Sequence, residues 1–198
     1  SFLANFGPMK FYLITFFFLI SSTIFSQTEN SKFTSHFQKQ FFVSTSIGIQ
    51  ISGIKNEDFI SKNVAPALTI GFGVWFKPEI AVQLSYKGPY FYTIADDDKH
   101  PYHSIFGEVL LNVNKIVNSK KDNKNRWSLI LHSGPGYFYN NYFNKASLNA
   151  NLGLINNIKL TEQLSFFMDV SFIVGWDIYQ GDEDILPSIV LGASYSFQ

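Results

Sequence analysis

Residues 164–179, LSFFMDVSFIVGWDIY, decide the fold. The even-numbered positions of this stretch are all apolar: Leu164, Phe166, Met168, Val170, Phe172, Val174, Trp176 and Ile178. The odd-numbered positions between them are mixed and include the carboxylates Asp169 and Asp177. Because successive side chains of a β-strand point to opposite faces, this period of two predicts one strand with an apolar face and a polar face.

The same alternation recurs in seven further segments of the chain. They are residues 41–52, 68–76, 82–87, 105–114, 127–132, 147–154 and 188–197. With the first stretch they predict eight strands, most of them ~9–13 residues long, which is the length that a tilted strand needs to cross a bilayer. Strands of soluble proteins are usually shorter, about 5–6 residues. Strand length therefore favours a membrane barrel.

The connections between the predicted strands alternate in length. Residues 77–79 and 161–163 form short turns, whereas segments 55–64, 95–103, 141–145 and 180–187 are longer. Outer-membrane barrels have short periplasmic turns and longer outside loops. The basic segment 118–125, NSKKDNKN, departs from this rule, because it falls among the short turns and is eight residues long.

The two faces of the strands differ in a way that distinguishes lipid from water. The apolar face is rich in Phe, Leu and Ile, and the other face is dominated by Gly, Ser and Asn. A barrel of eight strands has an interior only wide enough for side chains, so small polar residues suit its lumen. We therefore predict an all-β fold, an eight-stranded antiparallel up-and-down transmembrane β-barrel. The alternative is a secreted soluble sandwich or ligand-binding barrel with the opposite arrangement of faces.

Composition narrows the classes of function. The formal net charge is zero, so nothing indicates nucleic acid as a partner. The chain has no cysteine, which excludes disulfides, thiolate metal sites, cysteine nucleophiles and the cysteine-linked anchor of bacterial lipoproteins.

The N-terminal region is typical of a targeting segment. Met9 and Lys10 give a start and a positive charge, and residues 11–20, FYLITFFFLI, form an apolar run too short to span a bilayer as a helix. We expect a cleavable signal peptide with an upstream extension over residues 1–26, cleavage after Ser26, a polar lead-in over 27–39 and the barrel over 40–198. The alternative is an anchor that is retained.

Four charged residues on the predicted inner face are the main candidate site: Lys87, Glu108, Asp169 and Asp177. We considered Lys159 as a further member. A charge in a narrow lumen has to be paired or hydrated, because desolvating a lone charge is costly. We expect a structural network of ion pairs and hydrogen bonds. The alternative is a narrow path for ions or protons.

Metal and cofactor sites are not expected. The acidic runs 96–98 and 182–184 offer oxygen ligands but lack the spaced pattern of an EF-hand. His100 and His103 are three apart, which would suit one face of a helix, but Pro101 and the predicted loop remove that geometry.

Two short motifs resemble a known family. Residues 131–137, LHSGPGY, resemble the Gly-Pro-Gly-Tyr strand of the PorT-like outer membrane protein β-barrel family of Bacteroidota. The ending is similar to the signal read by the outer-membrane assembly machinery, carried here by Gly192, Tyr195 and Phe197, although the chain ends in Gln198 and has Val190 where a polar residue is usual. The eight strands resemble small barrels of the OmpX/OmpA type. The resemblance implies multi-pass residence in the outer membrane of a Gram-negative cell and association with a secretion or assembly system.

Some barrels of this size are lipid A deacylases or acyltransferases that use a histidine and a serine. Here the neighbouring pairs are His132–Ser133 and His103–Ser104. Adjacent strand residues point to opposite faces, so neither pair can form a nucleophile and its base. We predict that the chain is not an enzyme, with a lipid-modifying enzyme as the alternative.

The function expected from the sequence is that of a structural or interaction protein without an open pore. Its expected partners are outer-membrane lipid and lipopolysaccharide, the assembly machinery and other envelope proteins.

Overall fold

The computed structural model describes residues 38–52, 63–92, 99–117, 126–176, 178 and 183–197. The predicted signal peptide lies outside these residues, as do Asp177 and the connection 118–125. Eight strands and one short helix follow in order: β1 (Gln40–Ile51), β2 (Val64–Lys77), β3 (Ile80–Tyr92), β4 (Lys99–Asn112), α3 (Val113–Val117), β5 (Trp127–Asn140), β6 (Lys145–Lys159), β7 (Leu164–Trp176) and β8 (Glu183–Phe197).

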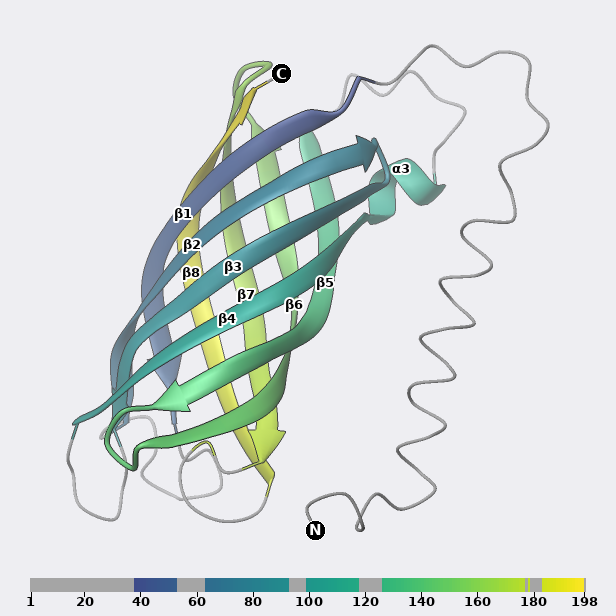
Figure 1. Ribbon diagram of the computed structural model, residues 1–198. Coiled ribbons are helices and arrows are strands. Elements are labelled where there is room, and N and C mark those ends of the chain that lie inside the picture. The colour runs from purple at the N-terminus through teal and green to yellow at the C-terminus, as the bar shows by residue number, and fades with distance from the viewer. Residues whose placement is uncertain are drawn as a thin grey trace, which may run out of the picture. The chain divides into compact units, whose positions relative to one another are not determined.

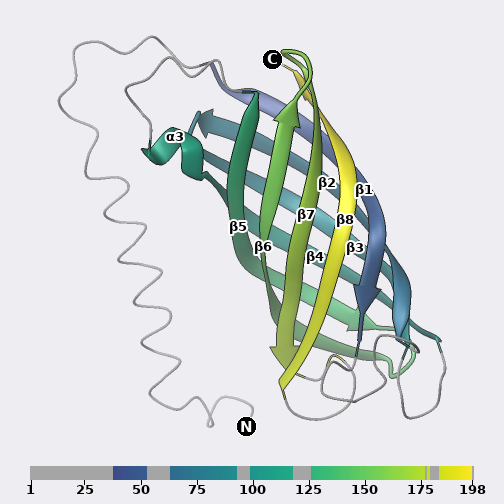
Figure 2. The same cartoon turned by 180° about the vertical axis from the view of Figure 1, so that it is seen from behind.

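The strands form one closed antiparallel barrel in which each strand pairs with its neighbour in sequence, and β1 pairs with β8 to close the wall (Figures 1 and 2). We call the end that carries the connections 78–79, 113–126 and 160–163 the turn end, and the opposite end the loop end. In Figure 1 the turn end is at the top, where α3 lies. The strands are 12 to 15 residues long, enough for a tilted strand to cross a bilayer. The predicted fold class is confirmed.

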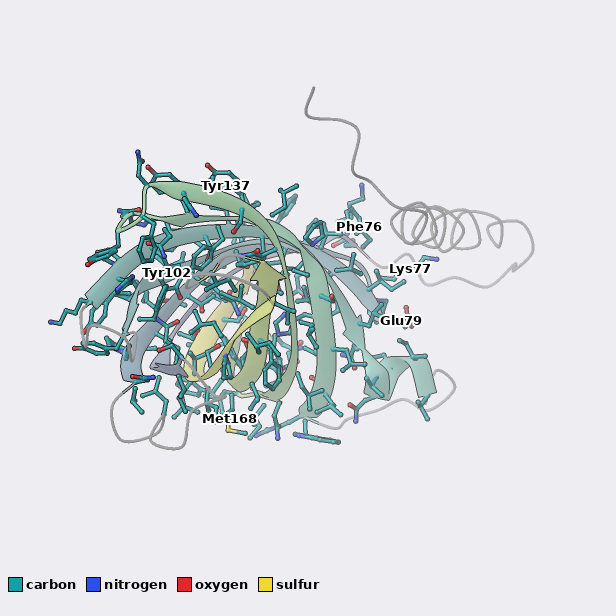
Figure 3. The ribbon with its side chains drawn as sticks, turned by 90° about the horizontal axis from the view of Figure 1, so that it is seen from below. Phe76, Lys77, Glu79, Tyr102, Tyr137 and Met168 are labelled. Atoms are coloured by element: carbon teal, nitrogen blue, oxygen red, sulfur yellow. The ribbon has the colours of Figure 1, made fainter. Side chains whose placement is uncertain are left out.

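The outer wall of the barrel is apolar over its middle. Large side chains there are extensively exposed, including Ile47 (69%), Leu84 (59%) and Leu191 (63%). Tyr137 and Met168 project outward, whereas Tyr102 points into the barrel (Figure 3). A soluble barrel would have these faces reversed, so the outer wall is suited to lipid.

The predicted faces of β7 are confirmed. Phe166 and Phe172 lie on the outside, while Asp169 and Ser171 are buried inside. Besides the small polar residues expected there, the lumen holds two apolar clusters that the sequence analysis did not predict. The cluster toward the loop end contains Phe91, Tyr102, Phe106, Phe138, Ile173, Ile178 and Leu186. The cluster toward the turn end contains Phe42, Ala81, Leu110 and Ile130, with Trp75 and Ile155 packed against it.

Three local predictions also differ from the structure. The strand expected to continue to Asn114 ends at Asn112, and residues from Val113 form α3 instead. The Asn112 side chain accepts a hydrogen bond from the backbone N–H of Lys115 at 3.2 Å, which caps the helix and favours ending the strand there. The loop predicted over 95–103 is shorter, because β4 begins at Lys99, and the loop predicted over 180–187 is shorter, because β8 begins at Glu183. None of the described helices is long and apolar enough to cross a membrane.

An arginine on the lipid-facing wall tests this arrangement, because its cost in unfolding free energy depends on how deep in the bilayer it lies. Leu191→Arg places a charge near the middle of β8, and we expect it to lower the free energy of unfolding by about 2–4 kcal/mol in phosphatidylcholine vesicles. The matched variant Leu148→Arg lies near the loop end of β6 and should cost at most about 1 kcal/mol, since the charge reaches the interface. Urea titration measures both values. Equal costs at the two positions would contradict the arrangement.

Candidate functional site

Seven polar side chains meet inside the barrel between the two apolar clusters. We call them the lumen network: Ser85 and Lys87 of β3, Glu108 of β4, His132 of β5, Asn151 of β6, and Asp169 and Ser171 of β7. All occupy inward positions near the middle of their strands, and all are buried. The alternation of the strands points each of them inward, and closure of the barrel brings them together.

Glu108 is the most connected member of the lumen network. Its Oε1 lies 2.7 Å from His132 Nδ1 and accepts a hydrogen bond from Asn151 Nδ2 at 2.6 Å. Its Oε2 accepts hydrogen bonds from the Ser85 hydroxyl and, at 3.3 Å, from Gln83 Nε2. Both oxygens of this buried carboxylate therefore have donors, which offsets the cost of its desolvation.

His132 links the two carboxylates of the lumen network. Its Nδ1 faces Glu108, and its Nε2 lies 3.0 Å from Asp169 Oδ1. An ionised carboxylate only accepts hydrogen bonds, so with both carboxylates ionised both ring nitrogens have to donate, as they do in a protonated imidazole. In that state the charges of His132 and Lys87 balance those of Glu108 and Asp169.

Lys87 extends the lumen network toward β8. Its Nζ donates hydrogen bonds to Asn151 Oδ1 at 3.1 Å and to Ser171 Oγ at 2.8 Å, and the charges of Asp169 and Glu108 attract it. The Ser171 hydroxyl lies 3.1 Å from that of Ser188. Polar contacts thus run continuously across the lumen from β3 to β8.

Two glycines make room for side chains that fill the lumen. A Cβ at Gly153 would lie 2.4 Å from His132 Nε2 and 2.5 Å from Ser171 Cβ. A Cβ at Gly136 would lie 2.1 Å from a ring carbon of Phe106 in the loop-end cluster. The Gly-Pro-Gly-Tyr segment of β5 therefore supplies space for an aromatic ring inside the barrel.

The loop-end cluster covers the lumen network on one side. Tyr102 and Phe138 stack with ring centroids 4.7 Å apart, and Tyr102 donates a hydrogen bond to Gln50 Oε1 at 2.6 Å. Ile178 is fully buried under this end, and its carbonyl accepts a hydrogen bond from Asn140 Nδ2 at 3.0 Å. Large rings and a fixed loop residue therefore fill the lumen between the network and the loop end.

The structure brings together three of the four residues proposed from the sequence, Lys87, Glu108 and Asp169, and Asp177 lies outside the described residues. Lys159 lies apart from them at the turn end, where its ammonium is 2.9 Å from Glu162. In the alternating segment 127–132, His132 falls opposite the apolar Leu129 and Leu131, but the sequence did not place it in this network. Period-two alternation could assign His132 to the inner face. It could not show which side chains of other strands His132 would contact across the barrel.

The histidine pairs considered from the sequence are split by the wall. His132 and Ser104 point inward, whereas Ser133 and His103 point outward. His103 Nδ1 lies 2.6 Å from the Tyr86 hydroxyl, and His132 contacts Glu108, Asp169 and Asn151. His100 is buried on the opposite face from His103, so the two cannot hold one ion. Over the described ranges, no group of three or more potential ligands is placed to hold a metal.

The predicted assembly signal lies on the last strand beside the seam. Tyr195 and Phe197 face outward, and the Phe197 ring stacks on Phe41 of β1 with centroids 6.1 Å apart. The Tyr195 hydroxyl donates a hydrogen bond to Gln163 Oε1 at 3.2 Å. A Cβ at Gly192 would lie 2.5 Å from the backbone oxygen of Thr45, so glycine permits the close approach of β8 to β1. The role of these residues in assembly stays a prediction.

No protein-family model matches the chain, and no curated protein matches it in sequence. The chain is similar in structure to Neisserial surface protein A, with a TM-score of 0.56, 8% identity and coverage of 79% of this chain and 97% of that one. It is also similar to the N-terminal β-barrel domain of OprF from Pseudomonas aeruginosa, with a TM-score of 0.52, 12% identity and coverage of 81% and 100%. A third similar structure is Ail, the attachment invasion locus protein of Yersinia pestis, with a TM-score of 0.50, 15% identity and coverage of 81% and 100%.

These likenesses show that the fold is that of small outer-membrane barrels of the OmpX type. PorT-like membership and the association with a secretion system stay predictions.

Removing the histidine that joins the two carboxylates tests the lumen network. His132→Leu leaves Glu108 and Asp169 without their shared donor in a buried site, and we expect a loss of about 3–5 kcal/mol of unfolding free energy. The control His103→Leu changes an outward histidine that contacts the exposed Tyr86 hydroxyl, and it should cost less than about 1 kcal/mol. Urea titration of the refolded barrel measures both. A similar loss in the two variants would show that the network carries no special stability.

A pair of glycine variants tests the packing around His132. Gly153→Ala places a methyl group against the imidazole and the neighbouring strand, and we expect a loss of about 1–3 kcal/mol. Gly107→Ala is the matched control, since a Cβ there meets no atom within 4 Å on the outer wall. The midpoint temperature of thermal unfolding should be lowered by the first change and left unchanged or raised by the second. The reverse order would contradict the described position of His132.

Proposed function

We propose that the chain is an integral, non-enzymatic outer-membrane protein of a Gram-negative cell whose role is structural or interactive and whose lumen does not conduct. The observation that carries the proposal is the filling of the lumen by the network and the loop-end cluster. A diffusive pore needs a continuous aqueous path, and Phe91, Tyr102, Phe106 and Phe138 stand across that path.

The contacts of the lumen network favour a structural role for its charges. Each carboxylate has a donor, Lys87 has two hydrogen-bond acceptors, and the charges balance when His132 is protonated. A transport path needs charges that can exchange partners with a passing ion, whereas these groups are buried and bound to one another. We therefore assign the network to holding the strands in one arrangement.

Because the lumen is filled, partners would contact the outer wall and the two ends of the barrel. The apolar wall fits lipid and the acyl chains of lipopolysaccharide. We place the turn end in the periplasm, because outer-membrane barrels carry their short turns there and their longer loops outside. The neighbour named as an attachment protein, Ail, has a comparable barrel and supports a role in contact rather than in catalysis.

Planar bilayer recording tests the closed lumen. We expect the purified, refolded barrel to insert and give almost no current, because eight strands leave no channel and large side chains fill the lumen. An open porin in the same lipid serves as the control for insertion and recording. Insertion is checked separately by protease protection of the barrel in the same membranes. Discrete, long-lived openings of porin size would contradict the proposal.

A further inference from the structure

A cavity of about 410 Å³ enters the barrel from the turn end. Its lining begins at turn-end residues such as Pro78, Asn114 and Gln163, and it extends inward as far as Glu108 and Asp169 of the lumen network. The loop-end cluster is not part of its lining. The cavity is therefore a pocket that is accessible from one end, and its volume falls within the range of about 300–1,000 Å³ found for small-molecule sites.

The mouth of this cavity is positively charged. Of the described residues at the mouth, Lys115, Arg126 and Lys159 are cationic and Glu162 is acidic. The Lys159 ammonium bonds Glu162 at 2.9 Å, and this hydrogen bond lowers the pKa of the Glu162 carboxyl, so Glu162 stays ionised and neutralises Lys159. The charges of Lys115 and Arg126 remain in excess and create a positive potential at the entrance.

The walls behind the mouth combine a group of apolar side chains with hydroxyl and amide side chains such as Ser44, Ser46 and Asn157. The apolar group consists of the aromatic side chains Phe42, Trp75 and Phe167 and the aliphatic side chains Leu110, Ile130 and Ile155. The carboxylates at the inner end contact His132, and Glu108 also accepts bonds from Ser85 and Asn151. The inner end thus presents little uncompensated negative charge to a molecule in the cavity.

We propose that this cavity binds a small organic anion with an apolar body, such as an aromatic carboxylate, whose charged group stays at the mouth. The apolar side chains of the wall would cover the body of the ligand, and Lys115 and Arg126 would pair with its carboxylate. Because both cations are near the protein surface, they select and orient the ligand, while burial of its apolar body supplies most of the affinity. The proposal goes beyond the role in the outer membrane and does not depend on it.

The experiment is calorimetric titration of 2-naphthoate into the full chain in nanodiscs of phosphatidylcholine, with empty nanodiscs subtracted. We expect saturable binding at one site. The neutral analogue 2-naphthamide should bind at least about fivefold more weakly, because it lacks the charge that the cations recognise.

Variants at the turn end separate the cavity from general surface charge. The double variant Lys115→Gln, Arg126→Gln should weaken 2-naphthoate binding by at least about fivefold. The matched control Lys39→Gln, Lys77→Gln removes two exposed turn-end cations that do not line the cavity, and it should change the affinity by less than about twofold. Glu162→Gln should strengthen binding, because it frees the charge of Lys159.

A third change blocks the cavity itself. Asn157 lines it, and Asn157→Trp would fill the space and should abolish binding. Altered gel migration on heating confirms that each variant is folded. Loss of binding in the two cavity variants, with the control pair unchanged, supports the proposal. Absence of saturable binding, an equal loss in both double variants, or unchanged binding in Asn157→Trp would overturn it.

Discussion

Pairing of every backbone N–H and C=O group within the wall is the constraint on which this structure depends. A bilayer offers no water to an unpaired strand edge, so a sheet that spans it has to close. Here the seam between β1 and β8 runs from the pair Phe41 and Phe197 to the pair Gln50 and Ser188. Closure fixes which side chains face lipid and which face inward, and it forces the inward side chains to fill a narrow space.

Three layers of side chains fill the lumen along the barrel. An aromatic cluster lies toward the loop end, the charged network lies in the middle, and a second apolar cluster lies toward the turn end. Burying the charges is costly unless each has a partner, which explains why His132 bridges two carboxylates and why Gly153 leaves space for its ring. The cavity at the turn end is a part of this interior that side chains leave open.

Much of this fold could be predicted from the sequence, because a period of two assigns a face to each residue of a strand. It placed Lys87, Glu108 and Asp169 inside and Phe166 and Phe172 outside, as the structure does. It could not show that His132 of β5 reaches Asp169 of β7, because that contact depends on the stagger of strands around the barrel. The inward position of Phe106 was missed because Ile105 and Phe106 are adjacent and both apolar, so the alternation does not assign a face to either residue. The five residues of α3 are too few to show a helical period.

The orientation of alternate side chains in β7 tests the arrangement of the barrel wall most directly. Because the chain has no cysteine, single cysteines can be placed at residues 165–174, labelled with a nitroxide and studied in lipid vesicles by electron paramagnetic resonance. The account predicts that collisions with lipid-dissolved oxygen rise at even-numbered positions such as Phe166, Met168 and Phe172, and fall at Ser165, Asp169 and Ser171. High oxygen access at the odd-numbered positions, or a period near 3.6, would contradict it.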